Sequence, residues 1–525
     1  MTAGRLVQSL LQDQATSAPD RLALVGGEER WTYGSLAEAA HGVARALRQN
    51  GVGRGDRVVL LLPADARAVI SIFGVLEAEA TFVVLHPSTK VDRLAQILGD
   101  AEPAAMITDR RRLHGAEAQI AALPSLRLLV MADDAPNPIA SLPSLAWSGI
   151  RPAAAAPPCR SISQDLATLI YTSGTTGRAK GVMSTHGNVL AATGAINAYL
   201  RHTPDDVVLD LLPLAFDYGL FQLFLAFQAG ARVVLEPGFA FPARLAELVE
   251  QERVTGLPCV PTIVATLLRQ PSIMAPLRRL RYVTNTGAAL PVAHLRELQR
   301  LLPETELISM YGLTECKRVS YLPPDQLARR PGSVGIPIPG TEVTVVDEAG
   351  REVPAGVPGE LVVRGAHVTR GYWRDPAASA RRFRPGAIPG ETVLYTGDVF
   401  TRDADGYLTF VGRTDDIIKT RGEKVSPREV EGVVCQLEGV LEAAVVGVPD
   451  PLLGEAVLLC VTARQDAELT ERAVRAHCAA RLDSFMQPAQ VRIVAALPRT
   501  DNGKVDKRRL AQDLLSQASV QETVP

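Results

Sequence analysis

Up to residue 283, hydrophobic and polar residues follow two patterns that alternate along the chain. Short apolar runs rich in β-branched residues, such as 57–62 and 81–85, have the length of buried strands. Between such runs, segments such as 66–79 and 91–98 carry apolar residues at helical spacing. Strands that alternate with helices in this way predict a parallel sheet with helices on both faces.

Other predicted elements of this region extend the same alternation in both directions. A hairpin of 22–25 with 31–33 and a helix at 36–47 come first. Residues 132–160 are rich in Ala, Pro and Ser, and we expect a surface connection there. Further along we expect strands at 166–170, 207–212, 232–235 and 280–283, and helices at 220–229 and 243–252.

The sequence pattern changes twice in the rest of the chain. From residue 331 to 410, short strands such as 342–346 are separated by Pro and Gly turns, which predicts a small β-rich subdomain. Beyond Gly412 the sequence predicts a compact α+β unit, with strands at 443–446, 456–461 and 491–494 and a helix at 471–482. We therefore predict an α/β fold with a large N-terminal domain, residues 1–412, and a small C-terminal domain, residues 413–525.

The composition is that of a soluble globular protein. With 525 residues, 47% of them hydrophobic and 21% charged, the chain is too long for one hydrophobic core. The net charge of -2 gives no electrostatic case for binding nucleic acid or an anionic membrane. The six cysteines form no C-x-x-C pair, which argues against a disulfide framework or a zinc site. No apolar run reaches the length of a membrane span and no signal-peptide core is present, so we expect a cytoplasmic protein.

One stretch, residues 171–181, combines glycines, hydroxyl side chains and a lysine directly after a predicted strand. Small residues let a backbone approach an anion closely, and exposed N–H groups and hydroxyls can then bind phosphate oxygens. Lys180 would add a positive charge. The stretch is not a Walker A loop, because arginine and not lysine follows Gly177. On these residues alone, a phosphate-binding loop and an ordinary surface loop both remain open.

A second segment, residues 310–316, places an aromatic ring, a hydroxyl and a carboxylate close together after a predicted strand. Tyr311 could stack on a base, and Thr314 could bond a phosphate. Glu315 could bind Mg²⁺ through an oxygen, the ligand that hard cations prefer. An ordinary strand exit would explain this segment equally well on its own.

Three more segments carry candidate polar residues, each with a plainer explanation beside the functional one. Asp398, which ends the segment 395–398, could accept ribose hydroxyls or simply cap a turn. Residues 412–424 are a charged segment at the composition break, which alone would be a solvated linker. Residues 498–507 form a glycine-containing turn that presents Lys504, and most such lysines are simply exposed.

Taken in their order and spacing, these five segments closely resemble the motif set of the adenylate-forming superfamily. Its members are the acyl- and aryl-CoA synthetases, the adenylation domains of peptide synthetases, and firefly luciferase. The resemblance runs from residue 31 to Lys507 and includes two more matching pieces, 364–373 and 448–455. It implies a large AMP-binding domain of mixed sheets followed by a small, mobile α+β C-terminal domain.

The resemblance implies a first reaction in which ATP and a carboxylate give acyl-AMP and pyrophosphate. A carboxylate is already a nucleophile, so no general base is needed, and a cation where the two anions meet stabilises the transition state. By this resemblance, Thr172, Ser173, Gly174, Thr175, Thr176, Gly177 and Lys180 hold the β- and γ-phosphates, Gly287, Ala288 and Tyr311 form the adenine pocket, and Asp398 and Arg413 bind ribose. Thr314 would bond the α-phosphate, Glu315 would ligate Mg²⁺, and Lys504 would bridge the carboxylate and the α-phosphate.

The second implied reaction is attack of a pantetheine thiol on the acyl-AMP. In the family the C-terminal domain rotates about a hinge, here Asp415, which would withdraw Lys504 and bring in Lys419 and the thiol tunnel at Gly422. CoA and the phosphopantetheine of a carrier protein present the same thiol. We expect a CoA ligase, and the alternative is a stand-alone adenylation enzyme that loads an amino or hydroxy acid onto a separate carrier protein. A non-catalytic nucleotide-binding module is a third alternative, disfavoured by the presence of all the expected polar groups.

The acid-binding segment is expected at residues 213–220. It is similar to a stretch of acyl- and aryl-CoA ligases, in which Phe216 would be the gating aromatic residue. It also resembles a stretch of amino-acid-activating domains, in which Asp217 would hold the ammonium group. Since a buried carboxylate without a cationic partner is costly, either the substrate carries an amino or hydroxyl group, or Asp217 pairs with Lys317 or Arg318. A plain fatty or aryl acid would fit the second case. The pocket candidates are Phe216, Asp217, Tyr218, Phe221, Pro258, Thr284, Thr286, Met310, Arg318 and Val319.

Overall fold

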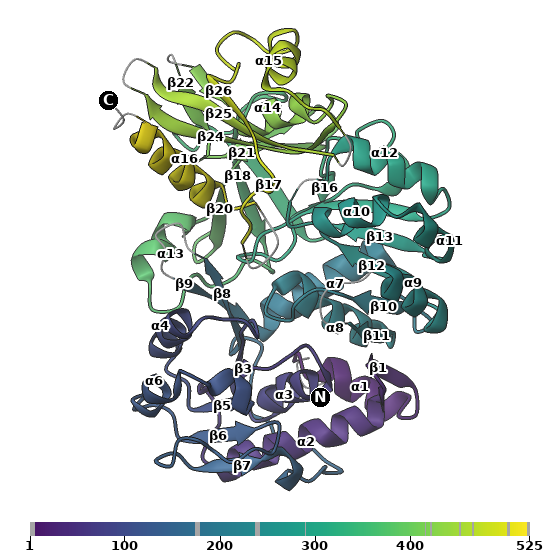
Figure 1. The fold of residues 1–525 in the computed structure, drawn as a ribbon. Coiled ribbons are helices and arrows are strands. Elements are labelled where there is room, and N and C mark those ends of the chain that lie inside the picture. The colour runs from purple at the N-terminus through teal and green to yellow at the C-terminus, as the bar shows by residue number, and fades with distance from the viewer. Residues whose placement is uncertain are drawn as a thin grey trace.

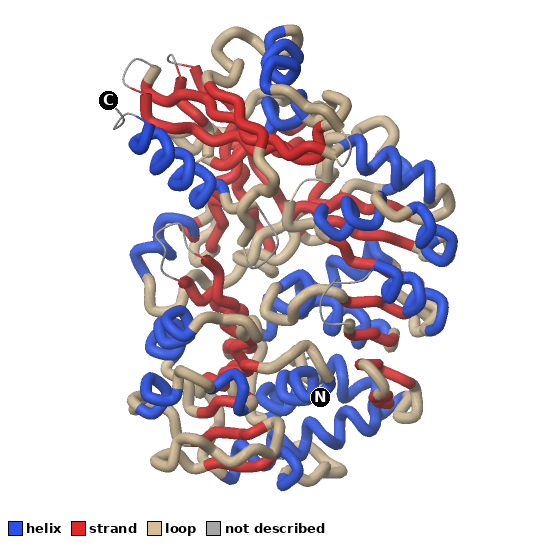
Figure 2. The backbone as a smooth tube through the Cα atoms, in the orientation of Figure 1, coloured by secondary structure: helices blue, strands red, loops and turns tan. Residues whose placement is uncertain are grey.

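The fold is described from a computed structural model of the chain. It describes residues 6–173, 179–236, 242–288, 290–414, 416–420, 423–450, 453–464, 467–500 and 505–521. Figure 1 shows the N-terminal sheet at one end of the molecule, a second sheet beside it, and the C-terminal unit at the opposite end. Strands of the sheets and helices that cover them account for most of the backbone (Figure 2).

The first sheet has seven strands and matches the alternation predicted for the N-terminal region. Its order is β7 (Ser144–Ala146), β6 (Leu128–Met131), β5 (Ala105–Thr108), β3 (Arg57–Leu61), β4 (Thr81–Val84), β8 (Leu166–Ser173) and β9 (Ala179–Thr185). All neighbours are parallel except the hairpin of β8 and β9. The expectation of a plain surface connection at 132–160 was wrong in one respect, because β7 lies there and pairs with β6. This strand is only three residues long, so it leaves no periodic signal.

The second sheet has nine strands and carries most of the candidate site. Its order is β16 (Ile336–Pro337), β15 (Ser320–Tyr321), β14 (Glu306–Tyr311), β13 (Tyr282–Asn285), β12 (Gly256–Cys259), β10 (Val207–Asp210), β11 (Arg232–Leu235), β1 (Leu22–Gly26) and β2 (Glu29–Thr32). The strands from β14 to β1 run parallel, and the predicted hairpin of β1 and β2 closes one edge. Parallel strands present their carboxyl ends at one edge of a sheet, which is where ligands bind in folds of this kind.

Apolar helices join these sheets into one core. The helices α2 (Tyr33–Gln49), α3 (Ala66–Glu77), α7 (His186–Leu200) and α8 (Asp217–Ala229) contribute buried residues to a single cluster with strands of both sheets. The ring of Phe73 on α3 stacks on Phe227 of α8, with centroids 5.5 Å apart. Helix α8 is buried from Asp217 through Phe227, as expected for a helix that is apolar almost all round.

The region of short predicted strands that begins at residue 331 forms a separate antiparallel sheet. It contains β17 (Thr341–Val346), β18 (Gly359–Gly365), β20 (Thr392–Arg402) and β19 (Phe383–Pro385), and β21 (Leu408–Arg413) pairs with β20. Its buried residues form their own cluster, which also takes in Val182 and Cys316 from the neighbouring segments. The β-rich subdomain predicted from the Pro and Gly turns is therefore present.

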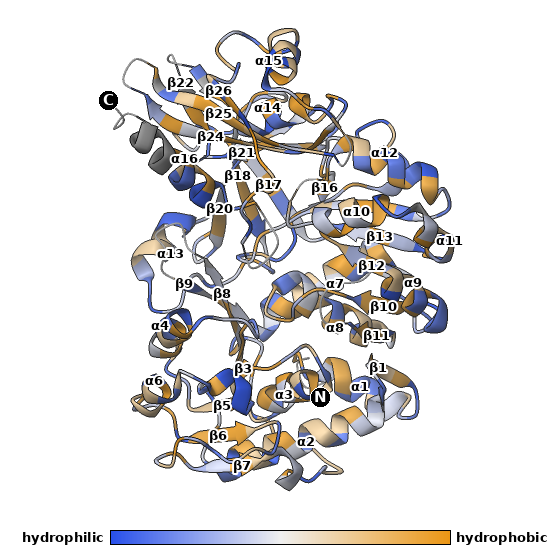
Figure 3. Ribbon diagram, viewed as in Figure 1, coloured by the Kyte–Doolittle hydropathy of each residue, from blue (hydrophilic) through white to orange (hydrophobic). Residues whose placement is uncertain are grey.

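The C-terminal part is an α+β unit with its own core. Its sheet contains β23 (Glu423–Val425), β22 (Ile418–Thr420), β25 (Gly454–Ala463), β24 (Val440–Asp450) and β26 (Gln490–Ile493), with α14 (Pro427–Val434), α15 (Glu471–Ala479) and α16 (Lys507–Gln521). Figure 3 shows the apolar residues of β25 here and of β6 in the first sheet. Strand β21 ends at Arg413, one residue past the boundary predicted at 412, and the division into two domains there remains a prediction.

Further described helices cover the edges and faces of these sheets. They are α1 (Ser9–Ser17), α4 (Val91–Ala101), α5 (Arg110–Leu113), α6 (Glu117–Ala121), α9 (Pro242–Gln251), α10 (Pro261–Leu268), α11 (Met274–Leu277), α12 (Val292–Leu301) and α13 (Pro376–Arg382). Across the described ranges, no helix has both the length and the apolar character needed to cross a membrane. All six cysteines lie in those ranges and are free, as expected from their spacing.

Candidate functional site

The expected site residues gather where parallel strands of the second sheet end. Pro258 on β12 and Thr284 on β13 are partners in the strand register, and Gly287 and Ala288 follow β13 directly. Strand β14 ends at Tyr311 and leads into the turn that carries the next two candidates. The sheet topology therefore brings together segments that are far apart in the sequence.

A tight turn after β14 presents Thr314 and Glu315. Lys317 donates its backbone N–H to the Leu313 carbonyl oxygen at 2.7 Å and lies in the left-handed region, with φ of 65°. Gly312 permits this turn, because a Cβ atom there would lie 2.1 Å from the Lys317 carbonyl oxygen. Left-handed residues other than glycine carry a conformational cost, and they concentrate at functional sites. The turn thus holds the hydroxyl and the carboxylate in one fixed arrangement.

Asp398, Arg413 and Tyr311 meet at the edge of the β-rich subdomain. The Tyr311 hydroxyl donates to Asp398 Oδ2 at 2.5 Å, and Arg413 Nε lies 3.2 Å from Asp398 Oδ1. Asp398 and Arg413 are opposite each other in the register of β20 and β21. Burial raises the pKa of the Asp398 carboxyl, and the Arg413 guanidinium and the Tyr311 hydroxyl oppose that rise. Oδ1 accepts no hydrogen bond from the described residues, so it can accept one from a ligand hydroxyl.

Glu315 and Lys180 both contact Tyr372, a tyrosine that the sequence did not single out as functional. The Tyr372 hydroxyl donates to Glu315 Oε1 at 2.6 Å, and Lys180 Nζ lies 5.1 Å from the centroid of the Tyr372 ring. Burial raises the pKa of Tyr372, so the hydroxyl stays protonated and keeps donating. Thr172 pairs with Lys180 in the register of β8 and β9. The matching piece 364–373 contained Tyr372 and was the only sequence signal for it.

Part of the predicted machinery lies outside the described residues. The predicted residues that lie there are Gly174, Thr175, Thr176 and Gly177 of the predicted phosphate loop, Asp415 and Gly422 of the predicted hinge and thiol tunnel, and Lys504. For Ser173 and Lys419 only the backbone is described. Their roles remain predictions.

Several pocket candidates are in contact around helix α8. The Tyr218 hydroxyl forms a hydrogen bond with Thr284 Oγ1 at 2.6 Å, and the Phe216 ring meets the Tyr218 ring edge-on. The Tyr199 hydroxyl lies 2.9 Å from the sulfur of Met310 on β14. These contacts join α7, α8, β13 and β14 around the place expected for the acid.

Asp217 is a carboxylate of this region that has no hydrogen-bond partner among the described residues. It stands in the first turn of α8 with 7% of its surface exposed. Among the described residues, no hydrogen-bond donor reaches its side chain and no cation lies within 4.0 Å of it. Lys317 is near enough to interact through its charge, because burial lowers the pKa of Lys317 and Asp217 opposes that lowering.

The two cations that the sequence offered as neighbours of Asp217 are both buried. Lys317 is 2% exposed, and its Nζ donates to the Thr314 carbonyl oxygen at 2.8 Å. Arg318 is 4% exposed and lies against the Tyr218 ring, 5.0 Å from its centroid. Val319 is fully buried in the cluster of the β-rich subdomain, and its place in the acid pocket remains a prediction.

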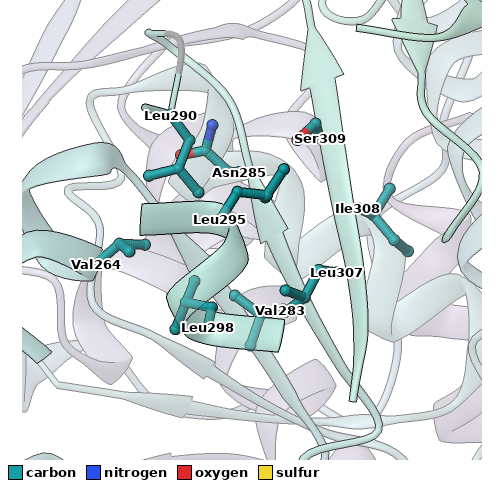
Figure 4. A pocket seen from close by; sticks show the side chains of 9 residues that line it. All are labelled: Val264, Val283, Asn285, Leu290, Leu295, Leu298, Leu307, Ile308 and Ser309. Carbon is teal, nitrogen blue, oxygen red and sulfur yellow. The ribbon is translucent and has the colours of Figure 1, made fainter. Parts of the chain in front are cut away.

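Two hollows elsewhere in the structure do not account for the acid pocket. Figure 4 shows the first, a cavity of about 10 Å³ that is apolar except for Asn285 and Ser309. It has room for about one water molecule, which is too little for a substrate. The second is an open cleft of about 870 Å³ beside β17 and β18. Arg364 in this cleft is paired with Glu342 and Glu391, and no residue assigned to the site by the sequence lines it.

The donor set is compatible with Mg²⁺ bound together with a nucleotide. Within the part of the chain that the structure describes, no three His, Cys, Asp or Glu side chains could hold a metal ion by themselves. Mg²⁺ usually takes one or two carboxylates and completes its shell with phosphate oxygens and water. A single carboxylate such as Glu315 fits that pattern.

Comparison with known families and proteins gives consistent results. A family model described as "AMP-binding enzyme" matches residues 11–373, and one described as "AMP-binding enzyme C-terminal domain" matches residues 429–504. An L-proline–[L-prolyl-carrier protein] ligase of Streptomyces coelicolor is 34% identical over 96% of both chains. A 3-hydroxybenzoate–CoA ligase of Aromatoleum sp. is 31% identical over 95% of this chain and 94% of its own. Surfactin synthase subunit 2 of Bacillus subtilis is 30% identical over 97% of this chain, which spans only 14% of that protein.

Solved structures agree with the sequence relatives. ATP-bound MatB from Rhodopseudomonas palustris has a TM-score of 0.87 at 29% identity, with 97% of this chain and 99% of that chain covered. The anthranilate CoA ligase AuaEII, in complex with anthranoyl-AMP, has a TM-score of 0.88 at 27% identity, with 99% of both chains covered. The similarity therefore extends over the N-terminal and the C-terminal parts together.

Proposed function

Because this chain belongs to the AMP-binding enzyme family, and is thus an adenylate-forming ligase, we propose that it activates a carboxylic acid bearing an amino group. In this proposal the carboxylate attacks the α-phosphate of ATP and releases pyrophosphate. The resulting aminoacyl-AMP then gives up its acyl group to the thiol of a phosphopantetheine arm, and AMP leaves.

The environment of Asp217 is the observation that supports an amino group on the substrate. Its carboxylate is buried, lies among the expected pocket residues and accepts no hydrogen bond from the described residues. A buried carboxylate without hydrogen-bond donors is costly, and Lys317, which interacts with Asp217 through its charge, donates no hydrogen bond to it. A substrate ammonium group would supply the missing donors. The uncharged end of a fatty or aryl acid would leave that cost in place.

For the thiol acceptor we propose a separate carrier protein. The relative with 34% identity over nearly its whole length is a ligase of L-proline and the prolyl-carrier protein, and the peptide synthetases also align with the chain. A relative of similar length at 31% identity uses CoA, which was the acceptor expected from the sequence. CoA and the carrier protein end in the same thiol, so measuring thioester formation with each of them is what distinguishes the two acceptors.

The nucleotide side of the proposal follows the geometry described above. Asp398 Oδ1 accepts from a ribose hydroxyl, and Tyr311 and Arg413 hold its carboxylate in place. Glu315 supplies a carboxylate oxygen to Mg²⁺, which offsets the negative charge of the phosphates. Lys504 bridges the two reacting anions during adenylation, as the family motif implies.

The test is ATP–pyrophosphate exchange with pairs of acids that differ only in the amino group. We expect each accepted amino acid to exchange about 10- to 100-fold faster than its des-amino partner, because a hydrogen bond to a charged group contributes about 1.5–3 kcal/mol. The variant Asp217→Asn, which keeps the shape and loses the charge, should abolish most of that preference. CoA and a holo-carrier protein are then added separately, and thioester formation is measured by mass spectrometry.

Two results would overturn the proposal. One is faster exchange with fatty acids or with 3-hydroxybenzoate than with any amino acid. The other is an unchanged preference in the Asp217→Asn variant. Thioester formation with CoA alone would keep the amino-acid part and replace the carrier protein by CoA.

A further inference from the structure

Arg318 is a buried arginine that the proposed chemistry has not used. It follows the turn that presents Thr314 and Glu315, and only 4% of its surface is exposed. Its guanidinium lies against the ring of Tyr218, and its Nη1 donates to the Lys317 carbonyl oxygen at 3.2 Å. A longer contact of 3.5 Å reaches Thr286 Oγ1. Arg318 thus lies among residues of the expected acid pocket.

The charge of Arg318 is not compensated by the protein around it. Among the described residues, no carboxylate lies within 4.0 Å of its guanidinium. Its Nε is buried and has no hydrogen-bond partner. A guanidinium has five N–H donors, and the acceptors found here are one carbonyl, the Thr286 and Tyr199 hydroxyls and the face of a ring. A buried ion in this state costs several kcal/mol relative to water.

Among the described residues, the neighbouring carboxylates interact with Lys317 and not with Arg318. Lys317 is a second buried cation beside Arg318, whereas Asp217 is the one carboxylate of α8 in this region. Glu315 also interacts with Lys317 through its charge, and its carboxylate accepts a hydrogen bond from Tyr372. Lys317 therefore interacts with two carboxylates, whereas Arg318 has no carboxylate partner among the described residues.

The other groups near Arg318 are polar and suit a hydrogen-bonding ligand. Tyr218 and Thr284 carry hydroxyls that are bonded to each other, and Thr286 follows in the same strand exit. Burial raises the pKa of the Tyr199 hydroxyl, and the nearby Arg318 guanidinium opposes that rise. These hydroxyls are neutral at ordinary pH, so they can orient an anion without repelling it.

We infer that Arg318 binds a second carboxylate, carried by the side chain of the substrate, so that the activated acid is an amino dicarboxylic acid. This inference rests on the proposed function, since Asp217 takes the amino group and the reacting carboxylate faces ATP. A guanidinium binds a carboxylate through two parallel hydrogen bonds, which would use the unpaired Nε. A substrate with a hydrocarbon side chain would leave this buried donor unpaired, and sites of this type reject such analogues strongly.

The experiment compares acids of equal length by ATP–pyrophosphate exchange with the full chain. One set is L-glutamate, L-glutamine and L-norvaline, and the other is L-aspartate, L-asparagine and L-2-aminobutyrate. In the set that the enzyme prefers, we expect kcat/KM for the dicarboxylic acid to exceed that for the apolar acid by about 10³-fold or more. The amide should fall between the two, because it can accept hydrogen bonds but carries no charge.

Variants at Arg318 separate a specificity role from a structural one. Arg318→Met keeps the length of the side chain and removes its charge, and we expect about 10²-fold or greater loss with the dicarboxylic acid only. Activity with the apolar acid should stay the same or rise. Arg318→Lys should retain part of the preference. Arg278→Met, at an exposed position, is the matched control and should change neither activity.

Each outcome decides between the inference and its alternatives. Equal or better activation of the apolar acid or the amide by the wild-type enzyme would overturn the inference, and so would an equal loss with all acids in Arg318→Met. If that variant fails to fold, the wild-type comparison alone decides. A preference for amino acids over des-amino acids without a preference for a second carboxylate would overturn only the role of Arg318. Absence of any amino-group preference would overturn the proposed function itself.

Discussion

Replacing Asp398 by Asn tests the assignment of the ribose site. The substitution keeps the size of the side chain and removes its negative charge. Asp398 has 8% of its surface exposed, and its Oδ1 accepts no hydrogen bond from the described residues. A bound ribose hydroxyl would therefore supply the hydrogen bond that this oxygen lacks, beside its ion pair with Arg413.

The expected magnitude follows from the contacts. A hydrogen bond to a charged group contributes about 1.5–3 kcal/mol and a neutral one about 0.5–1.5 kcal/mol. The change to an amide should thus cost about 1–1.5 kcal/mol per ribose hydroxyl, or about 2–3 kcal/mol for two hydroxyls. That corresponds to ATP binding about 30- to 150-fold more weakly. The Arg413 side chain is 41% exposed, so water can replace its lost partner and the variant should fold.

The assay is ATP–pyrophosphate exchange at varied ATP, with a thermal melting curve as the check on folding. Tyr311→Phe is the matched control, because it removes the hydroxyl bonded to Oδ2 and leaves Oδ1 and the ring in place. We expect that control to raise the KM for ATP by only about 5-fold. A folded Asp398→Asn protein with a KM for ATP within about threefold of the wild type would refute the assignment.

Three further predictions follow from the structure and the family motifs. Gly312→Ala should lower the rate of adenylation by about 10²-fold, because the added Cβ would collide with the Lys317 carbonyl oxygen in the turn after β14. Gly194→Ala is the control and should not change the rate, because an added Cβ there has nothing within 4 Å. Equal rates in the two variants would contradict this prediction. His41 lies 3.4 Å from Glu77, and although burial alone would lower its pKa, the carboxylate raises it above 6.5. The stabilisation from His41 should therefore be complete below pH 6.5 and lost as pH rises through the raised pKa, so the difference in Tm between wild type and His41→Gln should shrink as the pH is raised above 6.5. Lys504→Ala should slow acyl-AMP formation by about 10²-fold and largely spare thioester formation from supplied acyl-AMP, and equal loss in both steps would exclude alternating roles.

The sequence predicts the architecture well, because long periodic elements report on burial. The alternation up to residue 283, the β-rich texture after 331 and the α+β unit after 412 all correspond to sheets in the structure. Strands β5, β6 and β12 were not predicted, and β7, with three residues, is too short to show a period. Boundaries shift where helix and turn residues overlap, as at α8, which begins at Asp217 and not at Leu220.

The site was predictable where one segment carries its own chemistry, and less so where two segments must meet. Tyr311 and Glu315 stand out in a single motif, whereas the contact of Tyr372 with Glu315 joins positions 57 residues apart. No local pattern reveals such a contact. The sequence also left open whether Asp217 pairs with Lys317 or Arg318. In the structure both cations are buried, and neither is hydrogen-bonded to Asp217. The position of these two side chains depends on how the turn after β14 folds back, which the sequence pattern does not reveal.

The central claim is that the Asp217 carboxylate receives the amino group of the substrate. Its most direct test is the affinity of the protein for two non-hydrolysable acyl-AMP analogues, L-alanyl- and propanoyl-sulfamoyl adenosine, measured by titration calorimetry. These analogues differ only in the amino group. We expect the wild-type protein to bind the alanyl analogue about 10- to 100-fold more tightly and Asp217→Asn to remove the difference. Equal affinities in the wild-type protein, or a preference that survives in Asp217→Asn, would contradict it.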